Sequence, residues 1–286
     1  MGTTVEILLH VGDPGDDGAA LLDWAAGEVE RLEQAWSRFR PDSELCRLND
    51  SPEPVVEVSD TMLEVMARAR IGWELTGGRF DPTIIDSLES LGYVRSFQTF
   101  EGPTGGGPVG PSSTMADVSV DTVDRTVSRP TGVRFDLGGI GKGLMADLVA
   151  VGLVERGARS ACVGAGGDVR VAGEVPDGGW NIPVAHPVNG GEWFTASLTE
   201  GAIVTSTTVF RRWITEAGTP AHHIIDPVTG SPSGSGLDTV VVAAADAWWA
   251  EVLAKAALIA GHDDGVALLG SHGVTGWMVS SVEVAA

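Results

Sequence analysis

The sequence has little positive charge and almost no lysine. Its 286 residues include 18 Lys and Arg against 39 Asp and Glu, which gives a formal net charge of −21. Such a charge repels the phosphates of nucleic acids and of anionic membranes, so we expect no nucleic-acid partner. Only two of the cations are lysines, Lys142 and Lys255.

Cysteines and long apolar segments are also scarce. Cys46 and Cys162 lie far apart in unrelated patterns, which is typical of reduced thiols in a cytosolic protein. No segment approaches the run of about 20 apolar residues that spans a bilayer, and the first residues lack the basic and apolar regions of a signal peptide. The sequence therefore predicts a cytoplasmic protein without membrane insertion.

Apolar residues make up 43% of the chain, enough for a large core. Their helical spacing predicts helices over residues 16–39, 59–76, 141–155, 246–260 and 262–269. Short strand-like runs occur at 118–121, 126–128 and 133–136, and most others follow residue 160. Because strands and helices do not alternate regularly, we expect one α+β domain over residues 1–286. The Gly-, Pro- and Ser-rich segment 101–117 predicts a surface loop or a boundary between two lobes.

A glycine-rich turn in FDLGGIGKG (135–143) opens one of the predicted helices. Such a turn presents backbone N–H groups to an anion at the positive helix end, and Lys142 adds a full charge. The glycine spacing differs from that of a P-loop. A simple tight turn between strand and helix is an equally good interpretation.

Two further segments carry groups suited to a ligand site. In VGAGGD (163–168), Gly166 and Gly167 would let a ligand approach the backbone, and Asp168 could accept hydrogen bonds. A bulge or hairpin explains the glycines at least as well. In HHIIDPVTG (222–230) the adjacent histidines would face opposite ways in a strand, so only one can point into a site. A structural hydrogen bond is the alternative role for either.

Taken together, these segments resemble the ApbE family of FAD:protein FMN transferases. The matching segments are FDPT (80–83), DLGGIGKG (136–143), GAGGDVRVAG (164–173), IVTS (203–206) and HHIIDPVTGSP (222–232). The resemblance implies an α+β fold with FAD in a cleft between two lobes. It also implies transfer of the FMN half of FAD onto a Thr or Ser hydroxyl of an acceptor flavoprotein, with release of AMP. The alternatives are an FAD pyrophosphatase that gives FMN and AMP, and a non-catalytic FAD-binding protein.

The resemblance further implies which residues form the site. His223, directly before Ile-Ile-Asp-Pro, matches the functional histidine of the family and is the expected catalytic residue. The residues expected to bind or border FAD are Met1, Phe39, Phe80, Asp81, Asp136, Lys142, Gly166, Gly167, Asp168, Ser206 and Ile225.

The metal site that the resemblance implies departs from the family pattern. Family enzymes use Mg²⁺, held by a backbone oxygen that corresponds to Gly139 and by an Asp-x-x-x-Thr pair on the last long helix. Here Glu251 stands at the Asp position and Lys255 at the Thr position. We therefore expect Lys255 to supply charge that Mg²⁺ supplies elsewhere, although a plain i,i+4 ion pair with Glu251 would explain both residues. A second departure is Arg211-Arg212, near the place where relatives carry Gly-Asp-Tyr; these arginines could be solvated or could meet the acceptor.

Overall fold

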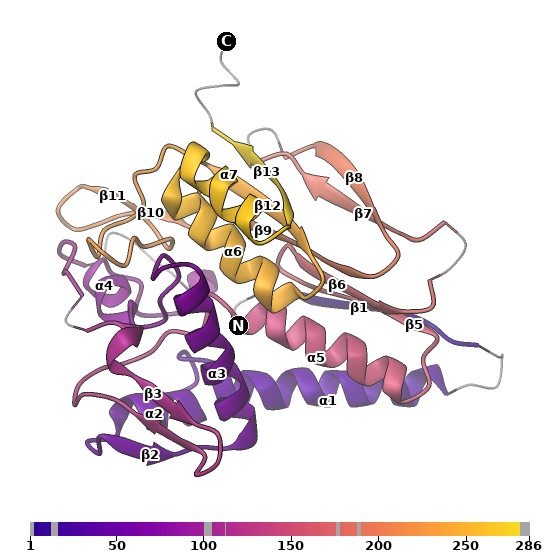
Figure 1. Cartoon of the computed structure of the whole chain (residues 1–286), viewed down its shortest axis with the longest axis horizontal. Coiled ribbons are helices and arrows are strands. Elements are labelled where there is room, and N and C mark those ends of the chain that lie inside the picture. The colour runs from indigo at the N-terminus through magenta and orange to yellow at the C-terminus, as the bar shows by residue number, and fades with distance from the viewer. Residues whose placement is uncertain are drawn as a thin grey trace.

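The centre of the molecule is a six-stranded sheet in which every neighbouring pair of strands is antiparallel (Figure 1). The computed structural model describes residues 3–12, 17–99, 105–111, 113–175, 178–187 and 190–280. In order across the sheet, the strands are β1 (Val5–His10), β5 (Ser160–Ala165), β6 (Asp168–Gly173), β9 (Gly201–Thr207), β12 (Thr239–Ala244) and β13 (Thr275–Val279). Together with the helices, this antiparallel sheet confirms the expected α+β class.

The remaining elements surround this sheet. They are α1 (Gly18–Trp36), α2 (Glu44–Asp50), β2 (Val55–Glu57), α3 (Asp60–Leu75), α4 (Ile85–Ser90), the 3-10 turns Phe97–Thr99 and Met115–Asp117, β3 (Ser119–Asp121), β4 (Thr126–Ser128), α5 (Gly141–Glu155), β7 (Trp180–Ala185), β8 (Glu192–Leu198), β10 (Arg212–Ile214), β11 (Pro220–His222), α6 (Ala247–Ala260) and α7 (His262–Ser271). Within the described part of the chain, no helix is both long and apolar enough to cross a bilayer.

Both faces of the sheet are covered, which explains the unbroken apolar runs of its central strands. Helices α5 and α6 pack on one face, where Val204 and Val240 join their core. The β7–β8 hairpin packs on the other face against Ile203 and Val241, the next residues of the same two strands. Alternate side chains of a strand point to opposite faces, so a strand covered on both sides needs apolar residues at every position.

A second group of elements lies at the end of the molecule where Figure 1 shows α4, β10 and β11 together. Leu88, Leu91, Trp213 and Ala221 form a separate apolar cluster there. The described residues 105–111 run along this group: Ser87 Oγ donates to the Val109 carbonyl at 2.9 Å, and other backbone bonds reach Ser90 and Glu216. This glycine-rich stretch is thus fastened to α4 and the β10–β11 hairpin.

Most predicted helices are present, with local corrections at their ends. Helix α3 begins as expected: Ser59 Oγ accepts from the Met62 amide at 3.2 Å, and Gly77, with a φ of 60°, follows its end. The first helix stops at Trp36 instead of residue 39, because Ser37 is extended and directs the following residues into a cleft. The short helices α2 and α4 were not expected from periodicity, since six or seven residues make too few turns to show a period.

Two strand predictions were wrong. Residues 133–136 form no strand; they lie in an irregular connection that leads into α5. The strand considered for HHIIDPVTG (222–230) does not extend past its first residue, since β11 ends at His222 and Ile225 makes only an isolated bridge with Pro232. Both segments border the cleft, and their backbone does not take part in regular strand pairing.

Candidate active site

A cleft opens where the chain around Ser37, the Asp136–Gly141 turn, α4 and the segment after β11 meet. Its empty space, counted with the open solvent at its mouth, is about 980 Å³. The lining residues are Trp36, Ser37, Arg38, Phe39, Arg79, Phe80, Asp81, Ile84, Leu88, Tyr93, Asp136, Leu137, Gly138, Gly139, Gly141, Lys142, Arg211, His223, Ile224, Ile225, Pro227, Lys255 and Ile259. The cleft thus collects residues from almost the whole length of the chain.

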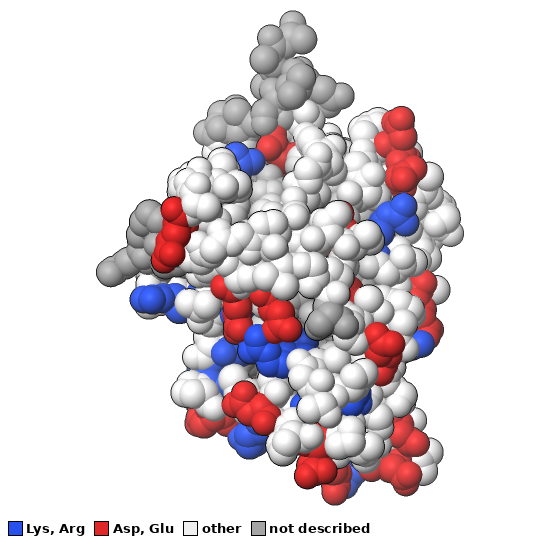
Figure 2. Space-filling model, turned by 90° about the vertical axis from the view of Figure 1, so that its left-hand side faces the viewer, with Lys and Arg blue, Asp and Glu red and all other residues white. Residues whose placement is uncertain are grey.

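The walls of the cleft are basic although the protein is acidic. Among the described residues, five cationic side chains line it, namely Arg38, Arg79, Arg211, Lys142 and Lys255, and two carboxyl groups, Asp81 and Asp136, do so as well. Two further carboxyl groups, Glu251 and Asp168, contact the lysines from behind the lining, so five cations face four carboxyl groups. On the side of the molecule that carries α4, β10 and β11, Figure 2 shows basic side chains gathered near the centre of the face, with acidic groups beside them. In a chain of net charge −21, this local excess favours an anionic ligand.

Arg38 ties an aromatic wall to the glycine-rich turn. Its Nε lies 2.5 Å from Asp136 Oδ2, and its Nη2 donates to the Tyr93 carbonyl at 2.7 Å. The guanidinium carbon is 4.3 Å from the Phe39 ring centre and 4.8 Å from that of Tyr93. Phe39 and Tyr93 meet edge to face at 5.7 Å. This wall offers an apolar surface with a fixed cation at its base, the combination that binds flat aromatic groups.

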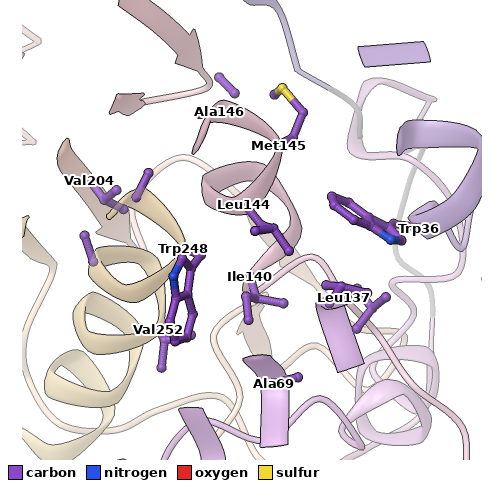
Figure 3. Close-up of a cluster of buried hydrophobic side chains, with 14 of the residues drawn as sticks. Trp36, Ala69, Leu137, Ile140, Leu144, Met145, Ala146, Val204, Trp248 and Val252 are labelled. Carbon is purple, nitrogen blue, oxygen red and sulfur yellow. The ribbon is translucent and has the colours of Figure 1, made fainter. Parts of the chain in front are cut away.

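The turn before α5 is held by its own carboxylate and by the core behind it. Asp136 Oδ1 accepts from the Gly138 amide at 2.6 Å. Behind the turn, Figure 3 shows Ile140 and Leu144 pointing into the space between Trp36 and the α6 residues Trp248 and Val252. The glycine-rich turn is therefore anchored to two helices while its front lines the cleft.

Both lysines of the chain meet one buried carboxylate at the inner end of the cleft. Glu251 is fully buried, and its Oε1 pairs with Lys142 Nζ and, at 2.9 Å, with Lys255 Nζ. Its Oε2 accepts from the Gly143 amide at 2.9 Å, in the first turn of α5. Lys142 also lies 2.7 Å from Asp168 Oδ2. One amide at the positive end of α5, where the sequence predicts a bound anion, is thus already used by Glu251.

The charges of this group hold Glu251 ionised. Burial raises the pKa of Glu251, but Lys142 and Lys255 outweigh it and bring the pKa down to about 2. Burial lowers the pKa of Lys142, but Asp168 and Glu251 outweigh it and hold the pKa above its usual value, so the ammonium stays charged. Burial lowers the pKa of Lys255, and Glu251 opposes that effect.

These residues do not fit Mg²⁺. The ion prefers six oxygen ligands at about 2.0–2.1 Å, whereas Glu251 Oε1 already has two ammonium partners and Oε2 an amide. Lys255 also covers Gly139: a Cβ built on that glycine would lie 3.4 Å from Lys255 Cδ. Among the residues that the structure describes, no three His, Cys, Asp or Glu side chains are grouped as metal ligands would be.

The two adjacent histidines lie in different surroundings. His222, the last residue of β11, uses both ring nitrogens: Nδ1 accepts from the Ile224 amide at 3.3 Å and Nε2 lies 3.2 Å from the Ser233 carbonyl. His223 lines the cleft, and its buried Nδ1 has no hydrogen-bond partner among the described residues. Burial, and then Arg211 and Lys255, lower the pKa of His223 well below 6.5. Its imidazole is neutral at neutral pH and can accept a proton.

Asp81 serves mainly to shape one wall. Its Oδ1 accepts from the Thr83 amide and hydroxyl at 2.9 and 2.7 Å, and its Oδ2 accepts from the Met115 amide at 3.1 Å. Burial raises the pKa of Asp81, while Thr83 and Met115 lower it. The carboxyl group thereby holds the loop 80–83, and with it Phe80, against the 3-10 turn at residues 115–117.

Asp147, downstream of the turn, fixes the start of α6. Its two oxygens accept from the Ala247 and Trp248 amides at 2.8 and 2.9 Å, and Oδ1 lies 3.0 Å from Arg170 Nε. Burial is the largest influence and raises the pKa of Asp147 to about 6. Gly143 permits this close approach of the helices, since a Cβ there would lie 2.4 Å from the Ala247 carbonyl oxygen. The helix that carries Glu251 and Lys255 is therefore set by α5.

The structure brings together most, but not all, of the residues expected in the site. Those that line the cleft are Phe39, Phe80, Asp81, Asp136, Gly139, Lys142, His223 and Ile225. Asp168 and Glu251 lie behind it and contact Lys142. Gly166, Gly167 and Ser206 do not line it: the glycines form the β5–β6 turn with φ of 59° and 101°, and Ser206 is buried in β9 opposite Val240. Met1 lies outside the described residues.

Three cleft residues were missed or left open by sequence reasoning. Arg38 lies in the segment SRFRPDSEL (37–45), which also resembles the ApbE family, but it was not expected to bind FAD; Tyr93, the only tyrosine of the chain, lies in no such segment. Arg211 lines the cleft, whereas Arg212 turns to the Thr208 carbonyl and to Asp238 Oδ1 at 3.1 Å. The doublet therefore contains one arginine at the site and one that fastens a loop.

Comparison with known proteins shows which family the chain belongs to. The family model described as "ApbE family" matches residues 1–278. The chain belongs to the ApbE family. A protein of Treponema pallidum named "FAD:protein FMN transferase" is 27% identical over 94% of this chain and 79% of its own.

Solved ApbE structures share the fold over nearly the whole chain. The ApbE protein of Thermotoga maritima has a TM-score of 0.80 and 27% identity, and the match covers 97% of this chain and 94% of that one. The flavin transferase ApbE of Vibrio cholerae has a TM-score of 0.81 and 25% identity, with 98% and 91% covered. The expected ApbE resemblance is thereby confirmed in both sequence and fold.

Proposed function

We propose that this protein binds FAD in the cleft and transfers its FMN half onto a Thr or Ser hydroxyl of an acceptor protein, with release of AMP. The observation that carries the proposal is the cleft itself, which combines aromatic walls with five cations in an otherwise acidic chain. FAD has an aromatic group at each end and a diphosphate between them, so its chemistry matches both properties. The names of the family relatives support the same activity.

The reaction is a displacement at phosphorus. The acceptor hydroxyl oxygen forms a bond to the phosphorus of the FMN half, the bond from that phosphorus to the bridging oxygen breaks, and AMP leaves with that oxygen. The hydroxyl proton passes to a base. His223 suits this role, because it lines the cleft and its ring is neutral at neutral pH.

The cationic residues serve the same step by binding and orienting the diphosphate. Phosphoryl transfer depends mainly on alignment and on neutralised phosphate charge. Arg211 lies on the same wall as His223, and Lys142 and Lys255 lie at the inner end. Fixed donors in a partly enclosed cleft need no reorganisation as charge moves to the leaving AMP.

The test is to incubate the purified protein with FAD and to quantify AMP, free FMN and protein-bound FMN separately. A protein flavinylated by the Vibrio cholerae relative serves as the acceptor, and a variant with its modified hydroxyl residue changed to Ala is the control. We expect AMP and acceptor-bound FMN in equal amounts, and neither with the control acceptor. Free FMN with AMP in the absence of acceptor would show a pyrophosphatase, and bound but intact FAD would show a binding protein.

A further inference from the structure

We infer that Lys255 occupies the place of a divalent cation, so that the cleft engages FAD through two lysine ammonium groups and without Mg²⁺. The inference rests on the proposed use of FAD and concerns how its diphosphate charge is neutralised. It begins from an unusual placement: the chain has 16 arginines and two lysines, and both lysines reach Glu251 Oε1.

The ammonium groups occupy the carboxylate oxygen that a metal ion would bind. Lys255 Nζ lies 2.9 Å from Glu251 Oε1, which is a full hydrogen bond to the oxygen that an ion would need. An ion bound there would lie within a few ångströms of two positive charges, at a distance where repulsion is strong in a partly buried site. The second oxygen of Glu251 is held by the Gly143 amide.

The lysines keep donors for a ligand after these internal bonds are made. An ammonium group has three N–H donors. Lys255 uses one for Glu251, and Lys142 uses one for Glu251 and one for Asp168. Both side chains line the cleft, where the Lys255 side chain is 15% exposed and the Lys142 side chain 12% exposed. As far as the described residues go, three donors on two fixed ammonium groups are therefore left for phosphate oxygens.

Glu251 has a definite part in this arrangement. It places both ammonium groups side by side and balances part of their charge while the cleft is empty, which offsets the cost of burying them. Its fixed position comes from α6, whose start is set by Asp147, and from the Gly143 amide of α5. Glu251 is thus a positioning residue for the lysines and not a ligand of the ion.

The first test uses the unmodified protein. FAD binding is measured by calorimetry after treatment with EDTA and again with excess Mg²⁺, and Mn²⁺ binding is followed by electron paramagnetic resonance with and without FAD. We expect the same FAD affinity in both conditions and no Mn²⁺ held at the protein. FAD binding or turnover that requires Mg²⁺ would overturn the inference while leaving the proposed function intact. A protein that binds no FAD in either condition would overturn both.

The second test changes the lysine. Lys255→Met keeps the length of the side chain and removes its charge, and we expect FAD affinity to fall about tenfold to hundredfold, the loss that accompanies removal of one hydrogen bond to a charged group. Lys255→Arg should retain most of the affinity, and Arg125→Met, which changes an exposed arginine outside the cleft, should bind like the wild type. Unchanged binding by Lys255→Met would refute the inference.

The third test restores the family pattern of ligands with Glu251→Asp/Lys255→Thr. Removal of the Lys255 ammonium takes away one of the two cationic partners of the carboxylate oxygen that also pairs with Lys142, and the threonine adds a hydroxyl ligand, so we expect this double variant alone to gain an FAD affinity that depends on Mg²⁺ and to bind Mn²⁺. Circular dichroism confirms that it is folded. A folded double variant that remains indifferent to Mg²⁺ would count against Lys255 as the replacement of the ion.

Discussion

The adjacent residues His222 and His223 lead to opposite predictions. Substitution of His223 should remove activity, and substitution of His222 should lower stability. His223→Ala takes away the proposed base, and general acid–base groups contribute roughly 10²- to 10⁴-fold to rate. FAD affinity should change little, because the variant keeps all five cleft cations. Its stability should fall less than that of His222→Ala, because Nδ1 of His223 bonds to no described residue.

His222→Ala should behave in the opposite way. It removes the partners of the Ile224 amide and the Ser233 carbonyl, and leaving buried polar groups unpaired costs about 1–3 kcal/mol in total. Since His222 is absent from the cleft lining, transfer by the folded variant should stay close to that of the wild type.

The assay for both variants combines chemical denaturation, FAD calorimetry and the rate of AMP release with acceptor present. Wild-type turnover should also stay constant as pH falls from mildly alkaline values through 6.5, because burial lowers the pKa of His223 well below that value. The native state binds this proton less readily than the unfolded chain does, so the wild type should lose stability relative to His223→Ala as pH falls below 6.5. Equal losses of turnover in the two variants would refute the assignment.

Three further outcomes follow from the helices and from the cleft wall. Asp147→Asn removes a carboxyl group whose pKa burial raises from 3.8 to about 6. The free energy of unfolding of the wild type, measured by denaturation at each pH, should therefore rise by up to about 3 kcal/mol relative to the variant as pH falls from above 6 towards 3.8. Gly143→Ala should cost about 1–3 kcal/mol by forcing α5 and α6 apart, whereas Gly270→Ala, on the exposed side of α7 with nothing near its Cβ position, should stabilise the protein by about 0.4–1 kcal/mol. Arg211→Met should weaken FAD binding about tenfold by calorimetry, whereas Arg212→Met should lower the melting temperature and spare FAD affinity.

The sequence predicted elements well where one physical rule dominated. The helix of α3 followed from Ser59, the apolar stripe and Gly77, all local features. The end of α1 did not, because Trp36 and Phe39 share a helical stripe, and only the pairing of Arg38 with Asp136 shows why the chain leaves the helix between them. That pairing joins residues almost 100 positions apart, and no periodicity carries such information.

Cleft residues that were predicted lie in sequence motifs, and cleft residues outside any motif were missed. Asp136, Lys142 and His223 lie in recognisable sequence motifs, and the structure places all three in the cleft. Tyr93 is an isolated aromatic residue in a connection after α4, so its place at the cleft depends on tertiary packing alone. The i,i+4 spacing of Glu251 and Lys255 predicted their pairing, but not that Lys142 would join the same oxygen from another helix.

The pairing of β1 with β5 has a consequence for how the protein is made. Val5 lies opposite Ala165 in the sheet, so β1 has no partner in this sheet until residue 165 has been synthesised. At about 5–20 residues per second, the ribosome needs roughly 8–30 s to add those residues. During that interval an unpaired apolar strand is exposed on the nascent chain, and closing the sheet over so long a loop is slow. Strand β1 is therefore made well before its partner and is among the later strands to be fixed, so protection from premature strand pairing matters most for β1.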